Sequence, residues 1–119
     1  MAPELAEIKI VKKPWGEEHW LAHTDRYAMK ILIVRQGHRL SLQYHERKME
    51  HQYVESGRVR VTLENAAGEL EEFEVGPGQG YAIPTCRKHR IEALEDLRIF
   101  EVSTPELEDV VRLSDDYGR

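Results

Sequence analysis

The segment GHRLSLQYHERKMEHQYVESG, residues 37–57, decides the fold, because it places polar residues where a core strand would place apolar ones. Its part LSLQYH alternates apolar and polar residues, and residues two apart on a strand share a face. Gln43 and His45 therefore point the same way, toward the interior if the leucines pack against an outer layer. A buried polar group without a partner costs about 1–3 kcal/mol. A metal ion bound by these side chains would offset that cost.

The alternative is that these polar residues lie on an exposed strand face, which Gln43 and His45 taken alone would favour. The spacing over the whole segment points the other way. It reads Gly37, five residues, Gln43-x-His45, four residues, Glu50, six residues, Gly57. A second pattern follows later in the chain and reads Gly78, five residues, Pro84, then Cys86, two residues, His89.

These two patterns, in this order, resemble the two-part signature of the cupin superfamily, which has His-x-His where this chain has Gln-Tyr-His. The superfamily pattern also has Gly at the position of Cys86. The resemblance implies an all-β, single-domain cupin double-stranded β-helix, an antiparallel jelly-roll barrel, over residues 1–119. It further implies one divalent metal ion, zinc first and manganese, iron or nickel as alternatives, held by Gln43, His45, Glu50 and His89.

The rest of the chain fits many short strands separated by Gly, Pro and Asn turns. A short C-terminal helix is expected after Thr104 and Pro105, which suit an N-cap and a first helical position, because ELEDVVRL has apolar residues at helical spacing. Residues 1–14 are expected to form an extended arm or to contact a dimer partner. Trp15 is expected to close one end of the barrel.

Composition excludes several classes of function. The 119 residues carry a net charge of −5, with basic and acidic residues interleaved, so nucleic acid is not an expected partner. No apolar run approaches the ~20 residues that cross a bilayer, and the N-terminus has acids where a secretory signal has basic residues. The single cysteine, Cys86, excludes an internal disulfide. We expect a cytoplasmic protein without a membrane partner.

The resemblance is closer than superfamily level. Together with the opening segment, KPWGEE (13–18), YAMKILIV (27–34), YAIP (81–84) and FEVSTPELEDVVRLSDDYGR (100–119) are similar to the type II mannose-6-phosphate isomerase cupin domain. That domain usually forms the C-terminal part of a bifunctional mannose-1-phosphate guanylyltransferase/mannose-6-phosphate isomerase. Gln at the position of Gln43 is characteristic of this branch, whereas the family's Trp is Gln52 here. The resemblance implies a homodimeric, metal-dependent isomerase that interconverts mannose-6-phosphate and fructose-6-phosphate through an enediol.

Such an isomerase needs a general base and cations for a phosphate. Lys30 either faces inward, where it would stabilise enediolate charge or take the proton, or is a strand-edge lysine in solvent. Glu101 is the carboxylate alternative for the base, although we favour a solvent-facing partner of an arginine for it. Arg47, in the loop between two ligands, is the first candidate to bind the phosphate of the sugar, and Arg112 is the second.

The remaining candidates have structural roles in this interpretation. Arg90 is expected to point away from His89, and His51 to lie on the face opposite Glu50. The histidines without ligand spacing are expected to be exposed, and they are His19, His23 and His38. No His–acid arrangement surrounds Cys86, so it is not expected to be a nucleophile.

Two other functions stay open. A non-catalytic, metal-containing module that binds a sugar or another small molecule is motivated by Gln52 and by the lack of a Gly-rich nucleotide loop. An oxygen-dependent cupin dioxygenase is less well supported, because that class usually has His where Gln43 stands.

Overall fold

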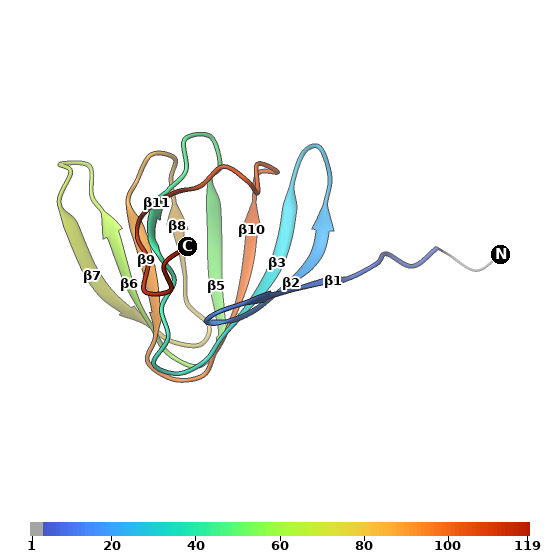
Figure 1. Ribbon diagram of the computed structural model, residues 1–119, viewed down its shortest axis with the longest axis horizontal. Coiled ribbons are helices and arrows are strands. Elements are labelled where there is room, and N and C mark those ends of the chain that lie inside the picture. The colour runs from blue at the N-terminus through green and yellow to red at the C-terminus, as the bar shows by residue number, and fades with distance from the viewer. Residues whose placement is uncertain (1–3) are drawn as a thin grey trace.

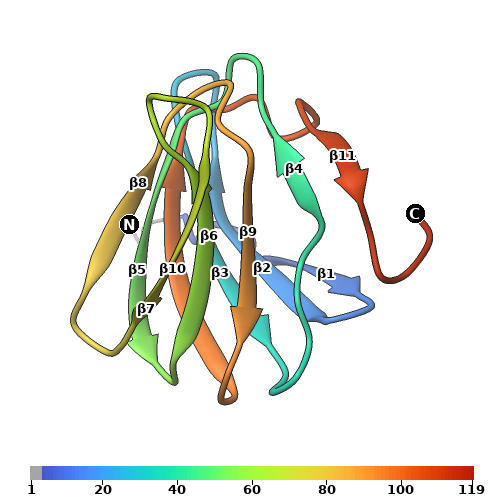
Figure 2. The ribbon, with the colours of Figure 1, turned by 90° about the vertical axis from the view of Figure 1, so that its left-hand side faces the viewer.

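The computed structural model describes residues 4–119, which form two antiparallel sheets packed face to face as a barrel (Figures 1 and 2). No helix occurs within this range. The strands of the described chain are β1 (Lys9–Lys13), β2 (Gly16–His23), β3 (Ala28–Val34), β4 (Leu42–Tyr44), β5 (Glu50–Ser56), β6 (Val59–Glu64), β7 (Leu70–Val75), β8 (Gly80–Ile83), β9 (His89–Ala93), β10 (Leu97–Ser103) and β11 (Val111–Ser114).

Strands far apart in the sequence lie side by side in both sheets. The six-stranded sheet has the order β1-β2-β3-β10-β5-β8, and the five-stranded sheet has the order β11-β4-β9-β6-β7. The chain therefore changes sheet between β3 and β4 and again between β4 and β5. This topology brings the two halves of the sequence pattern, on β4, β5 and β9, to the interior from both sheets.

The barrel interior is apolar at one end and polar at the other, and the strand register shows where it changes. Leu32, Ile99 and Val54 are paired neighbours on β3, β10 and β5, and all three are buried. Two residues along each strand, the next inward row is Lys30, Glu101 and Gln52, also buried. Because side chains two apart share a face, each strand contributes first to a dry core and then to a polar interior.

The apolar end is closed as expected by Trp15, which is 1% exposed and belongs to the core cluster. The next residue, Gly16, must be a glycine, because the backbone of Ile33 lies so close that a Cβ would be 1.9 Å from its carbonyl oxygen. The other cluster members are mostly valines and isoleucines of β3, β5, β6, β7, β9 and β10.

The expected C-terminal helix was wrong. Residues 104–110 form turns without a helix, and they cross from β10 to β11 at the end of the barrel where β4 leads to β5 (Figure 1). We call residues 104–110 the strap. Helical apolar spacing is outweighed here by β11, which adds an edge strand to β4, and by Asp109, whose carboxylate accepts hydrogen bonds from the backbone of residues 46–48.

The expected N-terminal arm is described from residue 4 onward, and residues 1–3 lie outside the described residues. Residues 4–8 are extended and exposed, and they lead away from the sheets in Figure 1. Residues 9–13 are not part of a free arm, since β1 pairs with β2 along its whole length.

Candidate metal centre

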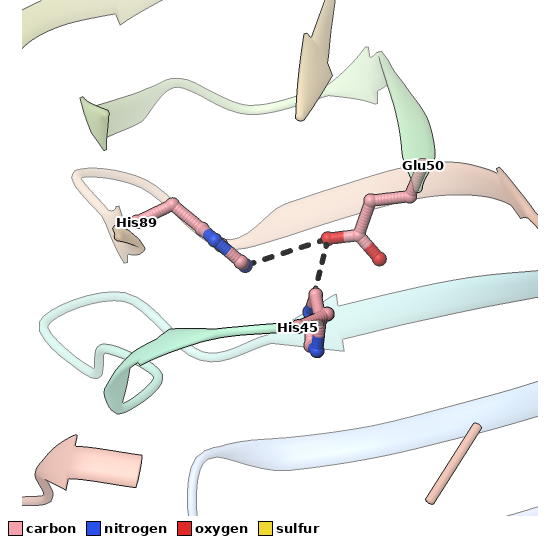
Figure 3. Close-up of side chains that lie close together, drawn as sticks. All are labelled: His45, Glu50 and His89. Atoms are coloured by element: carbon pink, nitrogen blue, oxygen red, sulfur yellow. Dashed lines mark ion pairs between the residues drawn. The ribbon is translucent and has the colours of Figure 1, made fainter. Parts of the chain in front are cut away.

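Three buried side chains converge at the polar end of the barrel, one from each of three strand ends. His45 follows β4, Glu50 begins β5 and His89 begins β9, and each is 3% exposed. The Nε2 atoms of His45 and His89 lie 3.8 and 3.5 Å from the same oxygen, Oε1 of Glu50 (Figure 3). Their potential ligand atoms all lie within 4.8 Å of one another.

Backbone carbonyls fix the tautomer of both imidazoles. Nδ1 of His45 lies 2.6 Å from the carbonyl oxygen of Asp109, and Nδ1 of His89 lies 3.0 Å from that of Arg87. A carbonyl only accepts, so Nδ1 carries the hydrogen in each ring and Nε2 presents its lone pair. Both Nε2 atoms are buried and have no hydrogen-bond partner.

This arrangement fits a divalent cation. Two imidazole lone pairs and a carboxylate oxygen face one point, and without a proton or a cation between them they repel. Nitrogen and oxygen donors of this kind are ordinary ligands for zinc, iron, manganese and nickel. The carbonyl bonds to Nδ1 are the outer contacts that orient ligating histidines in metal sites.

The protonation state of the histidines suits the same role. Burial, with a smaller contribution from the charge of Lys48, lowers the pKa of His45 to about 4. Burial also lowers the pKa of His89. Both rings are therefore neutral near pH 7 and ready to bind a cation through Nε2.

Gln43 lies beside this group, as a fourth ligand would. It is the register partner of His89 across β4 and β9, and it lines the inner cavity. Its Oε1 accepts a hydrogen bond of 3.0 Å from Ser41, which leaves a second lone pair on that oxygen. Metal binding by Gln43 remains a prediction.

A buried network of charges lies directly beneath these residues. Lys48 Nζ is 2.8 Å from Oε2 of Glu50 and 3.5 Å from Oε2 of Glu101. Lys30 Nζ is 3.2 Å from Oε1 of Glu18 and 4.0 Å from Oε2 of Glu101. Burial alone would lower the pKa of Lys48, but the charges of Glu101 and Glu50 outweigh it and raise that pKa. Lys48 is therefore a cation.

Glu101 is oriented by a second chain of hydrogen bonds. Gln52 Nε2 donates to its Oε1 at 2.9 Å, and Tyr81 donates to Oε1 of Gln52 at 2.5 Å. Burial raises the pKa of Tyr81, so its hydroxyl keeps its proton and acts as the donor. Gln52 thus connects Tyr81 on β8 to the charged interior.

The buried charges do not balance. Glu18, Glu50 and Glu101 face Lys30 and Lys48, which gives this interior a formal charge of −1 when the histidines are neutral. A divalent cation would change this to +1. The site would then favour an anion or a group that develops negative charge during a reaction.

Two hollows adjoin the charged residues. The inner cavity, lined by Gln43, Glu50, His89, Lys30 and Glu101 among others, has a volume of about 50 Å³. That is room for roughly four water molecules at about 12 Å³ each. We call the second hollow the mouth pocket, a space of about 490 Å³ between Trp20, His23, residues 46–47 and strap residues 105–109.

Trp20 connects the linings of the two hollows. It lines the mouth pocket, and its indole N–H donates to Oε1 of Glu18, a residue of the inner cavity, at 2.9 Å. Lys30 Nζ lies 5.2 Å from the centre of the indole ring.

Most of the residues singled out from the sequence meet in this interior. Lys30 faces inward, and Glu101 is 4% exposed, so the favoured interpretation of Glu101 as a solvent-facing partner was wrong. Arg47 is exposed and lines the mouth pocket rather than the inner cavity. Arg112 is exposed on β11, opposite Gln43 in register, and lines neither hollow.

The other sequence expectations have mixed outcomes. Arg90 is structural as expected, since it donates to the carbonyl oxygens of Leu40 and Ser114, and His51 is exposed. His23 is exposed, but the expectation was wrong for His19 and His38. Both are half-buried, because His19 pairs with Glu17 and His38 with Tyr117.

Lys48 and Glu18 were missed by sequence reasoning. The signal for Lys48 was available: it lies two residues before Glu50, so both belong to one face of an extended segment. Its charge suggested a surface residue instead. Glu18 carried no comparable signal, because it lies next to a second glutamate, Glu17, and is not spaced from any predicted ligand.

Cys86 links the two halves of the sequence pattern through its backbone. Among the described residues it is the only non-glycine with a positive φ, 61°, and its N–H donates to the carbonyl oxygen of His45 at 2.6 Å. Glycine adopts this conformation without the clash of a Cβ, which explains the glycine of the cupin pattern at this position. The thiol is exposed, and its Sγ lies 3.7 Å from the carbonyl oxygen of Glu46.

Comparison with known proteins gives relatives over nearly the whole chain. The family described as "Mannose-6-phosphate isomerase C-terminal" matches residues 3–115. A mannose-1-phosphate guanylyltransferase of Escherichia coli K12 is 32% identical over 112 residues, which is 92% of this chain and 23% of that protein. The alginate biosynthesis protein AlgA of Pseudomonas aeruginosa is 34% identical over 114 residues, again 92% and 23%. The chain thus spans about a quarter of the length of these relatives.

Solved structures show the same fold. KdgF from Halomonas superposes with a TM-score of 0.73 at 24% identity, covering 87% of this chain and 92% of that one. Oxalate decarboxylase from Bacillus subtilis superposes with a TM-score of 0.77 at 21% identity, covering 90% and 30%. The cupin barrel expected from the sequence is confirmed. No helix of the described residues is long and apolar enough to cross a membrane.

Proposed function

The chain belongs to the family of the mannose-6-phosphate isomerase C-terminal domain, and we propose that it is a metal-dependent sugar-phosphate isomerase. The proposed pair of substrates is mannose-6-phosphate and fructose-6-phosphate. One observation carries the proposal: two orphaned imidazole nitrogens and a carboxylate face one point, directly above a buried Lys–Glu network. Because sugar phosphates are charged and do not cross bilayers freely, we expect the reaction to take place in the cytoplasm.

His45, Glu50 and His89 would hold the divalent ion, with the carbonyl oxygen of Gln43 as the fourth ligand. When bound, the ion would supply a Lewis acid that polarises the carbonyl and hydroxyl oxygens of the sugar. Zinc is our first choice and manganese, iron or nickel the alternatives, since this donor set suits all of them.

Glu101 is the proposed general base. Aldose–ketose isomerisation moves one proton between adjacent carbons through an enediol, and one carboxylate can take the proton from one carbon and return it to the next. Gln52 holds Oε1 of Glu101, which leaves Oε2 as the oxygen that would carry the proton. Lys30 and Lys48, at 4.0 and 3.5 Å from Oε2, would stabilise the negative charge of the enediolate.

Because of the sizes of the two hollows, we assign a different part of the sugar phosphate to each of them. The inner cavity has room for the reacting carbons and their oxygens but not for a whole hexose phosphate. We assign the phosphate end to the mouth pocket, where Arg47 offers a bidentate cation, and keep Arg112 as the second candidate. The mouth pocket also contains four acids, so binding of the phosphate there depends on Arg47; the acids are Glu46, Glu106, Glu108 and Asp109.

A non-catalytic metal-containing binding module is the second candidate function. The small inner cavity favours it, because about 50 Å³ suffices for an ion and a few oxygen ligands without any sugar. In that case ligands would bind and stabilise the protein without turnover.

Incubation of the metal-loaded protein with mannose-6-phosphate in D₂O tests the proposal. We expect fructose-6-phosphate, together with deuterium at C2 of the recovered mannose-6-phosphate, because an enediol exchanges that proton with solvent. The variant Glu101→Gln should bind the metal normally and lose both signals. Stabilisation by sugar phosphates without product or exchange would overturn the isomerase and favour the binding module.

A further inference from the structure

Asp109, a strap residue far from β4 in sequence, holds the loop that carries His45 and Lys48. Its Oδ2 accepts hydrogen bonds from the backbone N–H groups of Arg47 and Lys48 at 2.6 and 2.9 Å, and its Oδ1 accepts one from Glu46 at 3.2 Å. One carboxylate thus satisfies three successive donors. Bonds of this kind to an ionised acceptor are roughly twice as strong as neutral ones.

The backbone of the same residue reaches the metal centre directly. The carbonyl oxygen of Asp109 accepts from Nδ1 of His45 at 2.6 Å. The position of that carbonyl depends on the strap, and the carboxylate of Asp109 is what ties this part of the strap to residues 46–48. The side chain therefore fixes both partners of the His45–carbonyl bond with respect to each other.

We infer that Asp109 is a positioning residue for the metal centre, acting through His45 and Lys48. This inference rests on the metal site of the proposed function and not on its isomerase activity. Without the carboxylate, the three N–H groups lose their acceptor and the loop is free to shift. The imidazole of His45 then loses its fixed orientation, and Lys48 its place between Glu50 and Glu101.

The strap has other attachments, so loss of this carboxylate should spare the fold. Thr104 donates its N–H to the carbonyl oxygen of Met49 at 3.1 Å, and its Oγ1 accepts from the N–H of Met49 at 3.1 Å. At the far end, β11 is paired with β4.

Zinc titration of the metal-free protein tests the inference, with Co²⁺ absorption as a second readout of ligand geometry. Asp109→Ala should weaken zinc binding about 10- to 100-fold, the usual effect of losing an outer contact to a metal ligand, and should alter the Co²⁺ spectrum. Asp109→Asn, which keeps one acceptor oxygen, should recover part of the affinity. The matched control is Asp116→Ala, which removes a comparable carboxylate bonded to Arg39 and should leave zinc binding unchanged.

The outcomes distinguish a positioning role of Asp109 at the metal centre from a purely structural role. If Asp109→Ala lowers thermal stability but binds zinc as tightly as the wild type, Asp109 is merely structural and the inference fails. If Asp109→Ala does not fold, Asp109→Asn decides, and unchanged affinity and spectrum in that variant overturn the inference. If the wild type binds no zinc, cobalt, manganese, iron or nickel, the metal site itself fails.

Discussion

Replacing Lys48 with methionine removes the cation that separates two buried carboxylates. Lys48 is 5% exposed, and its Nζ lies 2.8 Å from Glu50 and 3.5 Å from Glu101. At an effective dielectric constant of about 20, these contacts are worth about 6 and about 5 kcal/mol before the cost of burying the ammonium is subtracted. Removing one partner of a buried ion pair has a net cost of about 3–5 kcal/mol.

We expect Lys48→Met to lower the free energy of unfolding by that amount at pH 7, a large part of the roughly 5–15 kcal/mol that a domain possesses. In the variant the two carboxylates face each other without the cation that contacts both of them in the wild type.

Urea unfolding of metal-free protein at pH 7 measures this effect. Metal must be absent, because an ion at 100 times its Kd adds about 2.7 kcal/mol and would compensate for the missing charge. The control Lys88→Met changes an exposed lysine and should stay within about 0.5 kcal/mol of the wild type. A Lys48→Met variant as stable as this control would refute the charge network described for the interior.

Three further predictions address the site. The metal-free wild type should lose stability as the pH falls from about 6.5 toward 4. The pKa values of His45 and His89 are lowered in the folded state, so only the unfolded chain binds protons in this pH range, and each histidine contributes at most about 1.4 kcal/mol per pH unit. Urea unfolding of His45→Asn should show a weaker dependence of stability on pH. Glu101→Gln should reduce isomerisation by at least about 100-fold, as expected for loss of a general base, and a KM change without a kcat change would assign it another role. Arg47→Ala should raise KM for the sugar phosphate with metal content unchanged, whereas the exposed Arg26→Ala should have no effect on either; equal effects of the two variants would remove Arg47 from the site.

Strand alternation and the resemblance to the cupin pattern together made the position of this group predictable from the sequence. The period of two placed Gln43 and His45 on one face, and the resemblance implied the barrel that brings Glu50 and His89 beside them. These patterns are local, and in a closed sheet the alternation along each strand decides which side chains face the interior. The neutral state of the histidines, by contrast, depends on burial and carbonyl contacts that only the fold shows.

The errors have physical causes. The strap has helical spacing, but a helix of that length gains little by itself, and tertiary bonds to Asp109 and β4 outweigh it. Glu101 and Lys48 looked like surface residues because single charges are rarely buried. They are buried here because each compensates the other, and the sequence does not show that their two segments, far apart in the chain, lie side by side.

Zinc titration of the metal-free protein by calorimetry tests the central claim most directly. We predict one ion per chain for the wild type, and loss of binding in the double variant His45→Ala, His89→Ala. A wild type that releases no heat and shows no stabilisation with zinc or the other candidate ions would contradict the account. So would a double variant that binds zinc as tightly as the wild type.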